Sequence, residues 1–368
     1  MAHTYKVRYF NFTARGEPIR MLLSYGEIPF EDERIAREDW PKIKPTTPLG
    51  QLPVLEIDGK QIPHSISICR YLASIVKLDG KDARENLRID VAVETLLDLQ
   101  KLAFEYVFET DAAKKDEKNK KVKESVPLFL GKLEEHAKQN GGYTALDRVC
   151  IKYLESLVFN TKLNNVVDKE SFSVLLLDTG FLCLKHFMFN LHPVYLKFLY
   201  ILATPLGQLP LLEVDGKAIP QSTAICRYLA SIVKLDGKDA KENLALDVAL
   251  ETLFDLQKMN GEIKYEQDAA KKKEKLEKLL QQGLPLYFGK LDEYAKKHNG
   301  YIAFERLSWA DILFVCVYEA LVNLAGKEAV ASYPSLQQVK KNVLATKGIN
   351  KWIKNRPAVE GYDLKQDL

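Results

Sequence analysis

The stretch ICRYLASIVKLDGKDA occupies residues 68–83 and recurs without change at residues 225–240. The match extends backward to TPLGQLP, which begins at Thr47 and again at Thr204, and forward through ETLLDLQK and ETLFDLQK. All of these matches keep one offset of 157 residues. Self-similarity at a fixed period marks a repeated structural unit, so the chain contains two copies of one unit.

Each copy is incomplete at a different end. The first copy diverges after Arg148, whereas the second copy has no counterpart of residues 1–46 before Thr204. Residues 149–203 match neither copy and show no clear hydrophobic period. Two interpretations of this joint stay open. It is either a non-native junction, in which two tandem genes merged and non-coding sequence is translated, or a true fusion segment that helps to complete the second copy.

The composition is that of a soluble globular protein. The 368 residues are enough for about two or three domains, and 46% apolar with 28% charged residues argues against wholesale disorder. The net charge is only +3, and lysines alternate with acids from Asp111 to Glu124, so a nucleic-acid partner is not expected. The five cysteines form no metal-binding spacing, and we expect mostly buried free thiols and no metal.

Two further stretches bear on location. Residues 1–10 carry polar and charged side chains where a secretory signal has an apolar core, so we expect a cytoplasmic protein. The most apolar region, Ser171 to Leu202, is interrupted by Asp178 and Lys185, and no membrane span is expected.

The first copy begins with the pattern of a small mixed sheet. Residues 5–10 and 30–35 are strand-like, and between them Pro18 opens a helix, since proline is tolerated in a first helical turn. Asp58-Gly59 favours a tight hairpin turn between two further short strands, and Ser65 then opens another helix. The order βαβ followed by ββα implies a small sheet with helices on its faces.

Beyond Asp82 the first copy shows only amphipathic helix patterns. The second copy adds Ser308-Trp309-Ala310-Asp311, in which Ser308 caps a helix and Asp311 is the returning acid of a capping box. The first copy has no such box after Arg148, so we expect its helical part to lack the later helices.

Several motifs together resemble sigma-class glutathione transferases, the class that includes glutathione-dependent prostaglandin D synthase, and the insect members are most similar. The motifs are YFNFTARGEPIR from Tyr9, WPKIKPTTPLGQLPVLEIDG from Trp40, HSISICRYLA from His64 and SWAD from Ser308. The resemblance covers residues 1–148 and 204–368.

The resemblance implies an α/β and all-α fold, with a thioredoxin-like N-terminal domain followed by an all-helical C-terminal domain, partly duplicated. The expected domains are residues 1–80 (thioredoxin-like, first copy), 81–148 (partial helical domain, first copy), 149–203 (unassigned joint), 204–239 (C-terminal half of a thioredoxin-like domain, second copy) and 240–368 (helical domain, second copy).

Enzymes of this family activate the thiol of glutathione with a tyrosine at the end of the first strand, and Tyr9 occupies that position. A hydroxyl that donates to sulfur favours the thiolate, and only the thiolate is an effective nucleophile. Arg15 resembles the family's arginine near the thiol and would add positive charge. From spacing alone, Tyr9 is equally an aromatic residue packed in the core.

The resemblance also implies how the tripeptide is held. Gln51-Leu52-Pro53 matches the family's loop with a cis proline, which leaves the preceding backbone free to pair with the ligand. Ser65 begins a helix, and the unpaired N–H groups at a helix start would bind the γ-glutamyl carboxylate. The alternatives are an ordinary trans loop and a plain N-cap serine.

Three further matches concern the ends of glutathione. Trp40 and Lys44 match positions that contact its glycine end; the alternative is a packing tryptophan and a solvated lysine. His64 replaces the family's glutamine, which the second copy has as Gln221. Histidine still donates a hydrogen bond, so this departure affects affinity more than identity.

Asp98 and Asp255 match the acid that reaches from the neighbouring subunit to the free amine of the ligand, although each is equally a helix-surface acid. Phe10, Phe12 and Arg15 would line part of the electrophile pocket.

The second copy is not expected to activate a thiol by itself. The offset carries Tyr9, Arg15, Trp40 and Lys44 onto Val166, Phe172, Lys197 and Ile201, and nothing there replaces the tyrosine hydroxyl. A vestigial half-site remains, made of Gln208, Leu209, Pro210, Gln221 and Ser222.

These residues and the resemblance predict a transferase that conjugates glutathione, its co-substrate, to small hydrophobic electrophiles such as lipid-peroxidation products. The alternatives are a glutathione-dependent prostaglandin D isomerase and a non-catalytic, crystallin-like protein. Since family dimers pair like surfaces, we expect a homodimer or an intramolecular pseudo-dimer. In the pseudo-dimer the helices after Asp82 and Asp239 pack together, and Asp255 reaches the site of Tyr9.

Overall fold

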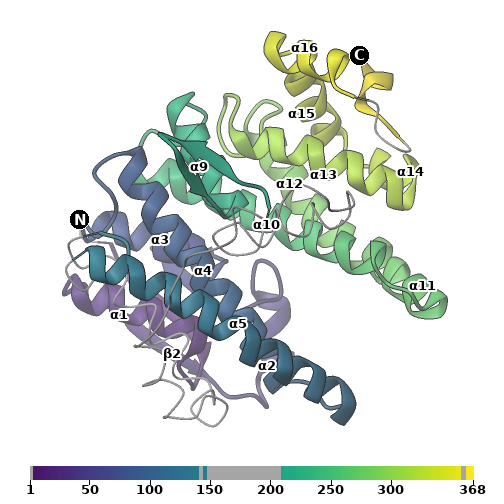
Figure 1. Ribbon diagram of the computed structural model, residues 1–368. Coiled ribbons are helices and arrows are strands. Elements are labelled where there is room, and N and C mark those ends of the chain that lie inside the picture. Colours follow the sequence, from purple (N-terminus) through teal and green to yellow (C-terminus); the bar gives the residue numbers. More distant parts are fainter. Residues whose placement is uncertain (1–2, 141–143, 147–208, 358–361) are drawn as a thin grey trace, which may run out of the picture. The chain divides into compact units, whose positions relative to one another are not determined.

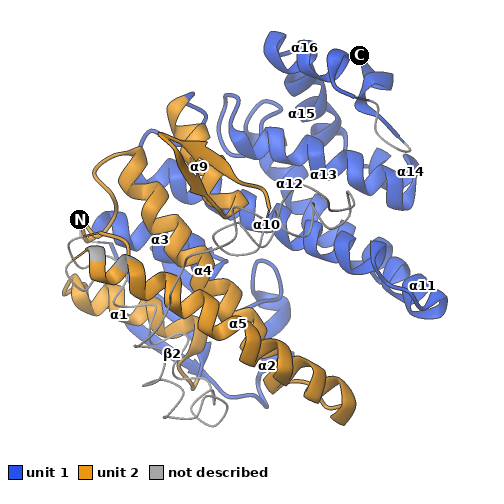
Figure 2. Ribbon diagram, in the orientation of Figure 1, with its two compact units in different colours: residues 1–10, 29–75, 233–368 blue, residues 11–28, 76–232 orange. Residues whose placement is uncertain are grey.

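The computed structural model describes residues 3–140, 144–146, 209–357 and 362–368 (Figure 1). The joint at 149–203 and Gln208 lie outside these residues. The chain divides into two compact units, one made of residues 1–10, 29–75 and 233–368 and the other of residues 11–28 and 76–232 (Figure 2). Each unit therefore combines segments of both copies.

The first unit holds the four-stranded sheet. Its strands are β1 (Tyr5–Phe10), β2 (Glu31–Ile35), β3 (Val54–Ile57) and β4 (Lys60–Ile62), in the order β2-β1-β3-β4. β1 pairs with β2 in parallel, and the other two pairings are antiparallel. Alternate residues of β1 are buried, as expected for a strand with one face in the core. The predicted strands and the predicted thioredoxin-like arrangement are confirmed.

The predicted hairpin turn is also confirmed. Asp58 and Gly59 both have positive φ, +50° and +79°, which is the signature of the type I′ turn that joins adjacent strands. The second copy makes the same turn at Asp215 and Gly216, with φ of +51° and +74°. Its hairpin forms although it stands outside the four-stranded sheet.

Helices make up the rest of the first unit. They are α2 (Trp40–Ile43), α3 (Ser65–Ile75), α10 (Ala240–Lys264), α11 (Ala269–Lys278), α12 (Leu284–Lys297), α13 (Trp309–Ala325), α14 (Glu328–Ala331), α15 (Pro334–Ala345) and α16 (Lys347–Asn355), with 3-10 turns η2 (Lys44–Thr46) and η5 (Leu364–Asp367). α10 packs against both α3 and α13, so it joins the sheet-bearing part of the first copy to the helices of the second.

The capping box predicted at the start of α13 is present. The backbone N–H and the hydroxyl of Ser308 both donate to Asp311 Oδ2 at 2.7 Å, and Ile302 N–H donates to Oδ1 at 2.7 Å. Asp311 is fully buried, and burial raises the pKa of its carboxyl. The carboxylate thus satisfies donors that would otherwise be buried without partners.

The second unit is built on α4 (Ala83–Val107) and α5 (Ala112–Gln139), which lie side by side (Figure 1). Its other elements are η1 (Ala14–Gly16), α1 (Glu17–Tyr25), β5 (Leu212–Val214), β6 (Lys217–Ile219) and α9 (Ser222–Ile232). Leu96, Leu99 and Phe129 belong to the core between α4 and α5. α9 of the second copy packs against α4 of the first.

One insertion distinguishes the two copies in this region. Asp268 and Pro285 are separated by one residue more than their counterparts Asp111 and Pro127. In the first copy α5 runs through without a break, whereas the second copy has a π turn at Leu279–Gly283 between α11 and α12. A π turn is the usual way for a helix to absorb one extra residue.

Two expectations from composition have outcomes within the described residues. Cys226 and Cys316 are exposed, so the expectation of mostly buried thiols is wrong for them. No helix in the described part of the chain combines the length and apolar character needed to cross a bilayer.

We predict that the ion pair between α9 and α4 stabilises the second unit. Arg227 Nε donates to Asp90 Oδ2 at 3.0 Å, and the Asp90 side chain is only 9% exposed. Arg227→Met would leave a buried carboxylate without this partner and lower the free energy of unfolding by about 3 kcal/mol in urea denaturation.

Arg84→Met is the matched control, because the Arg84–Asp215 pair of the same unit is mostly exposed. Its effect should stay below about 1 kcal/mol. Equal effects of the two substitutions would contradict the stabilising role of the buried pair.

Candidate functional site

The sheet brings the predicted site segments to one edge. In the parallel pairing of β1 with β2, Phe10 lies opposite Ile35, so both strands end at the same edge. In the antiparallel pairing Arg8 lies opposite Val54, so β3 starts where β1 ends. β4 runs back along β3 and ends at that edge too. Tyr9, the loop before β3 and the start of α3 therefore meet there.

Tyr9 lies at the end of β1 with only 6% of its surface exposed. Its ring contacts Phe10 edge-on, with the centroids 5.7 Å apart, and Phe10 contacts Trp40 in the same way at 5.6 Å. Trp40 begins α2, and Lys44, which begins η2, is exposed. Contacting aromatic rings thus connect Tyr9 to the segment predicted to bind the glycine end of glutathione.

The loop before β3 has the predicted backbone. The Leu52–Pro53 bond is cis, and so is Leu209–Pro210 in the second copy. Gln51 Nε2 donates to Asp255 Oδ2 at 3.2 Å. Since Gln51 and Asp255 belong to the same unit, the acid of the second copy lies at the edge that carries Tyr9.

His64 and Gln221 share an unusual backbone conformation at the start of their helices. Their φ angles are +70° and +75°, in the left-handed region that few residues other than glycine adopt. Each immediately precedes a helix-starting serine, Ser65 or Ser222, and Ser65 is buried. Backbone strain of this kind is found preferentially at ligand sites.

The hydrogen bonds of His64 fix its tautomer. His64 Nε2 lies 3.1 Å from Thr252 Oγ1, and Thr252 donates its hydroxyl hydrogen to the carbonyl of Val248 at 2.7 Å. A threonine hydroxyl has one hydrogen, so Thr252 is the acceptor toward His64 and Nε2 carries the proton.

The half-site of the second copy contacts an acid of the first copy within the other unit. Gln221 Nε2 donates to Asp98 Oδ2 at 3.1 Å. Leu209 is exposed, and Ser222 begins α9. Asp98 therefore lies beside the vestigial residues Gln221 and Ser222.

Two predicted residues are not brought to the edge of the sheet within one unit. Phe12 and Arg15 belong to the second unit, and both are exposed. Their roles beside Tyr9 stay predictions.

The sequence did not single out two residues that contact the predicted ones. Thr252 accepts from His64, and the Tyr287 hydroxyl accepts a hydrogen bond from Gln51 Nε2 at 3.1 Å. Comparing the two copies could have found Tyr287, because it corresponds to Phe129 and differs from it by a hydroxyl group.

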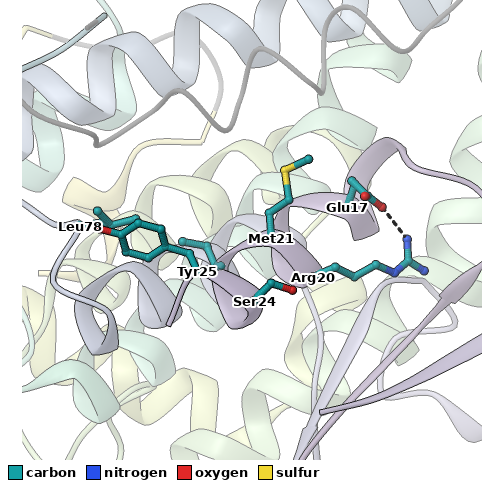
Figure 3. Close-up of a pocket in the computed structure, with 7 residues that line it drawn as sticks. Glu17, Arg20, Met21, Ser24, Tyr25 and Leu78 are labelled. Carbon is teal, nitrogen blue, oxygen red and sulfur yellow. Dashed lines mark hydrogen bonds and ion pairs between the residues drawn. The ribbon is translucent and has the colours of Figure 1, made fainter. Parts of the chain in front are cut away.

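A pocket of about 440 Å³ lies on α1 in the second unit (Figure 3). Glu17 and Arg20, joined by a hydrogen bond of 3.1 Å, stand at one end of it. The remaining lining residues are Met21, Leu22, Ser24, Tyr25 and Leu78. No residue predicted to bind glutathione lines this pocket, so we assign no function to it.

Two family models match the sequence. The model of the glutathione S-transferase N-terminal domain matches residues 5–74 and again residues 195–231. The model of the glutathione S-transferase C-terminal domain matches residues 254–356. The second N-terminal match covers only the part that corresponds to residues 38–74 of the first.

Curated relatives come from the same group. A glutathione S-transferase of Anopheles gambiae is 48% identical over 145 residues, which are 39% of this chain and 71% of that protein. Glutathione S-transferase S1 of Drosophila melanogaster is 41% identical over 148 residues, 40% of this chain and 59% of that protein. Hematopoietic prostaglandin D synthase of Mus musculus is 48% identical over 98 residues, 27% of this chain and 49% of that protein.

Proposed function

Because the chain belongs to the glutathione S-transferase family, we propose that it conjugates glutathione to small hydrophobic electrophiles at the sheet edge that carries Tyr9. The observation that carries this proposal is the convergence there of Tyr9, the cis-proline loop and Asp255. The family relationship supplies the co-substrate, glutathione.

The chemistry starts with the thiol. A hydrogen bond from the Tyr9 hydroxyl to sulfur would stabilise the thiolate, and lowering a thiol pKa by about two units needs roughly 2.7 kcal/mol. A charge-assisted hydrogen bond is of the right size to supply much of this free energy. The buried position of Tyr9 supports this role, because water competes little with a hydrogen bond there.

The rest of the edge would hold the tripeptide. The N–H groups at the start of α3, beside Ser65, would bind the γ-glutamyl carboxylate, and the Asp255 carboxylate would bind the adjacent ammonium. The backbone of the Gln51–Pro53 loop would pair with the cysteine residue. Lys44, which is exposed, would neutralise the glycine carboxylate beside Trp40.

A sigma-class assignment and a second activity are supported by one observation. The identity of 48% to a hematopoietic prostaglandin D synthase lies in the range of the transferase relatives, although it covers a shorter stretch. Isomerisation of a prostaglandin endoperoxide by the same thiolate is therefore the second candidate. A non-catalytic, crystallin-like role is disfavoured by the retention of Tyr9 with its surroundings.

We further propose that one chain forms a pseudo-dimer from its two copies. The pairing of Gln51 with Asp255 and the pairing of Gln221 with Asp98 support it, because both contacts join a segment of one copy to α4 or α10 of the other. The second N-terminal match, which lacks the counterpart of residues 1–37, supports a tandem arrangement of one complete and one truncated copy.

Tyr9→Phe should lower turnover by about ten- to a hundredfold, or about 1.4–2.8 kcal/mol of activation free energy. The reason is loss of the hydroxyl that stabilises the thiolate. Turnover of a chromogenic aryl halide at saturating glutathione measures the rate, and its pH profile should show a raised pKa for the bound thiol. Unchanged rate and pH profile would remove Tyr9 from this role.

The chain should bind glutathione at no more than one complete site. Val166 stands where Tyr9 would be in the second copy, and no other residue there supplies the hydroxyl. Titration calorimetry should therefore give a stoichiometry of one per chain. Two equivalent sites would contradict the assignment of the second copy as vestigial.

Light scattering of the intact chain tests the pseudo-dimer. If the second copy covers the helical face through which the first copy would dimerise, the chain should be a monodisperse monomer that still binds glutathione. An obligate dimer would overturn the proposal, since the second protomer would then supply that face.

A further inference from the structure

We propose that Tyr287 is a positioning residue of the candidate glutathione site, where its hydroxyl orders the Gln51 amide and the Asp255 carboxylate. The inference rests on the proposed function for its ligand. The contacts themselves lie within one unit of the ligand-free chain.

The three side chains form a closed set of contacts. The Tyr287 hydroxyl accepts from Gln51 Nε2 at 3.1 Å, and Gln51 Nε2 also donates to Asp255 Oδ2 at 3.2 Å. The hydroxyl donates toward the same carboxylate oxygen at 3.4 Å, which is long for an O–H···O bond. Tyr287 thus acts on Asp255 mainly through the shared amide and less through its direct contact.

The environment keeps the Tyr287 hydroxyl protonated. Only 7% of the residue is exposed, and burial together with the nearby Asp255 carboxylate raises the pKa of the phenol. A protonated phenol offers one donor and an acceptor, which is what a group between an amide and a carboxylate needs.

The effect expected of such a set is pre-organisation. Gln51 is exposed and long, so without a partner it would sample many rotamers and would have to be ordered when a ligand binds. The hydroxyl of Tyr287, which is a buried residue of α12, restricts the Gln51 side chain and so removes part of this entropy cost before the ligand binds. The benefit should appear in affinity for the ammonium end of glutathione, because Asp255 is the charged member of the set.

The first copy shows that folding alone does not require the hydroxyl. The residue at the equivalent helix position is Phe129, which is 5% exposed and lies in the apolar core of the second unit. A phenylalanine therefore fills this place in the helical domain. The copy that serves the Tyr9 edge has the hydroxyl, and it follows the π turn at Leu279–Gly283.

The test is Tyr287→Phe in the full chain, which restores the residue of the first copy. The Kd of glutathione by calorimetry should rise about five- to tenfold, and kcat at saturating glutathione should change less than twofold. Tyr294→Phe is the matched control, because it removes a phenol from the same helix at a position with no role in the set. It should leave both the Kd and kcat unchanged.

A double-mutant cycle separates positioning from a structural effect. Asp255→Asn should weaken binding, and adding Tyr287→Phe should cost less than it does in the wild type, because the two side chains act together. Unchanged Kd in Tyr287→Phe would overturn the proposal. Two other results would also overturn it. One is that both tyrosine variants show the same rise in Kd, the same fall in kcat and the same fall in urea midpoint; the other is that the effects in the cycle are additive.

The same cycle in ligand-free chain keeps this inference distinct from the proposed function. If the wild type fails to bind glutathione, the proposed function falls. The urea unfolding midpoints of Tyr287→Phe, Asp255→Asn and the double variant then still show whether the two side chains interact. Additive unfolding midpoints would overturn the positioning role, and non-additive ones support it.

Discussion

The packing of α3 against α10 is the contact on which the candidate site depends. α3 carries the helix start at Ser65, and α10 carries Thr252 and Asp255. The two helices come from different copies, so their contact brings an acid of the second copy to the sheet of the first. Without it, Gln51 and His64 would lose the partners found for them on α10.

The same kind of contact recurs in the second unit, where α9 packs against α4. Polar bonds accompany the packing there too, since Arg227 pairs with Asp90 and Gln221 with Asp98. The apolar side of α9 is less well covered than that of α3. Leu229 is 42% exposed, whereas its counterpart Leu72 is fully buried. A two-stranded hairpin offers a helix less apolar surface than a four-stranded sheet.

Much of the fold could be predicted because it rests on local rules. The strands of the first copy, the Asp58-Gly59 turn and the capping box at Ser308 each depend on residues within a few positions of one another. The resemblance predicted that Tyr9 and the loop before β3 belong to one site. The register of β1 with β3 gives this prediction a physical basis, because it places both at the same edge of the sheet. Tyr287 could not be predicted in this way, because its partner Gln51 is distant in the sequence and only tertiary packing brings them together.

The vestigial half-site illustrates how binding residues and structural residues separate. Gln221 and Asp98 keep the family's residue types although the second copy, to which Gln221 belongs, has no hydroxyl equivalent to that of Tyr9. Both are also polar groups at the contact between α9 and α4, where an unpaired carboxylate would be costly. Their pairing thus has a reason that does not involve glutathione. In the first unit Asp255 shares its carboxylate with Gln51 and Tyr287, two donors that a cationic ligand group complements without displacing. The same acid position therefore serves stability in one unit and, by our proposal, ligand binding in the other.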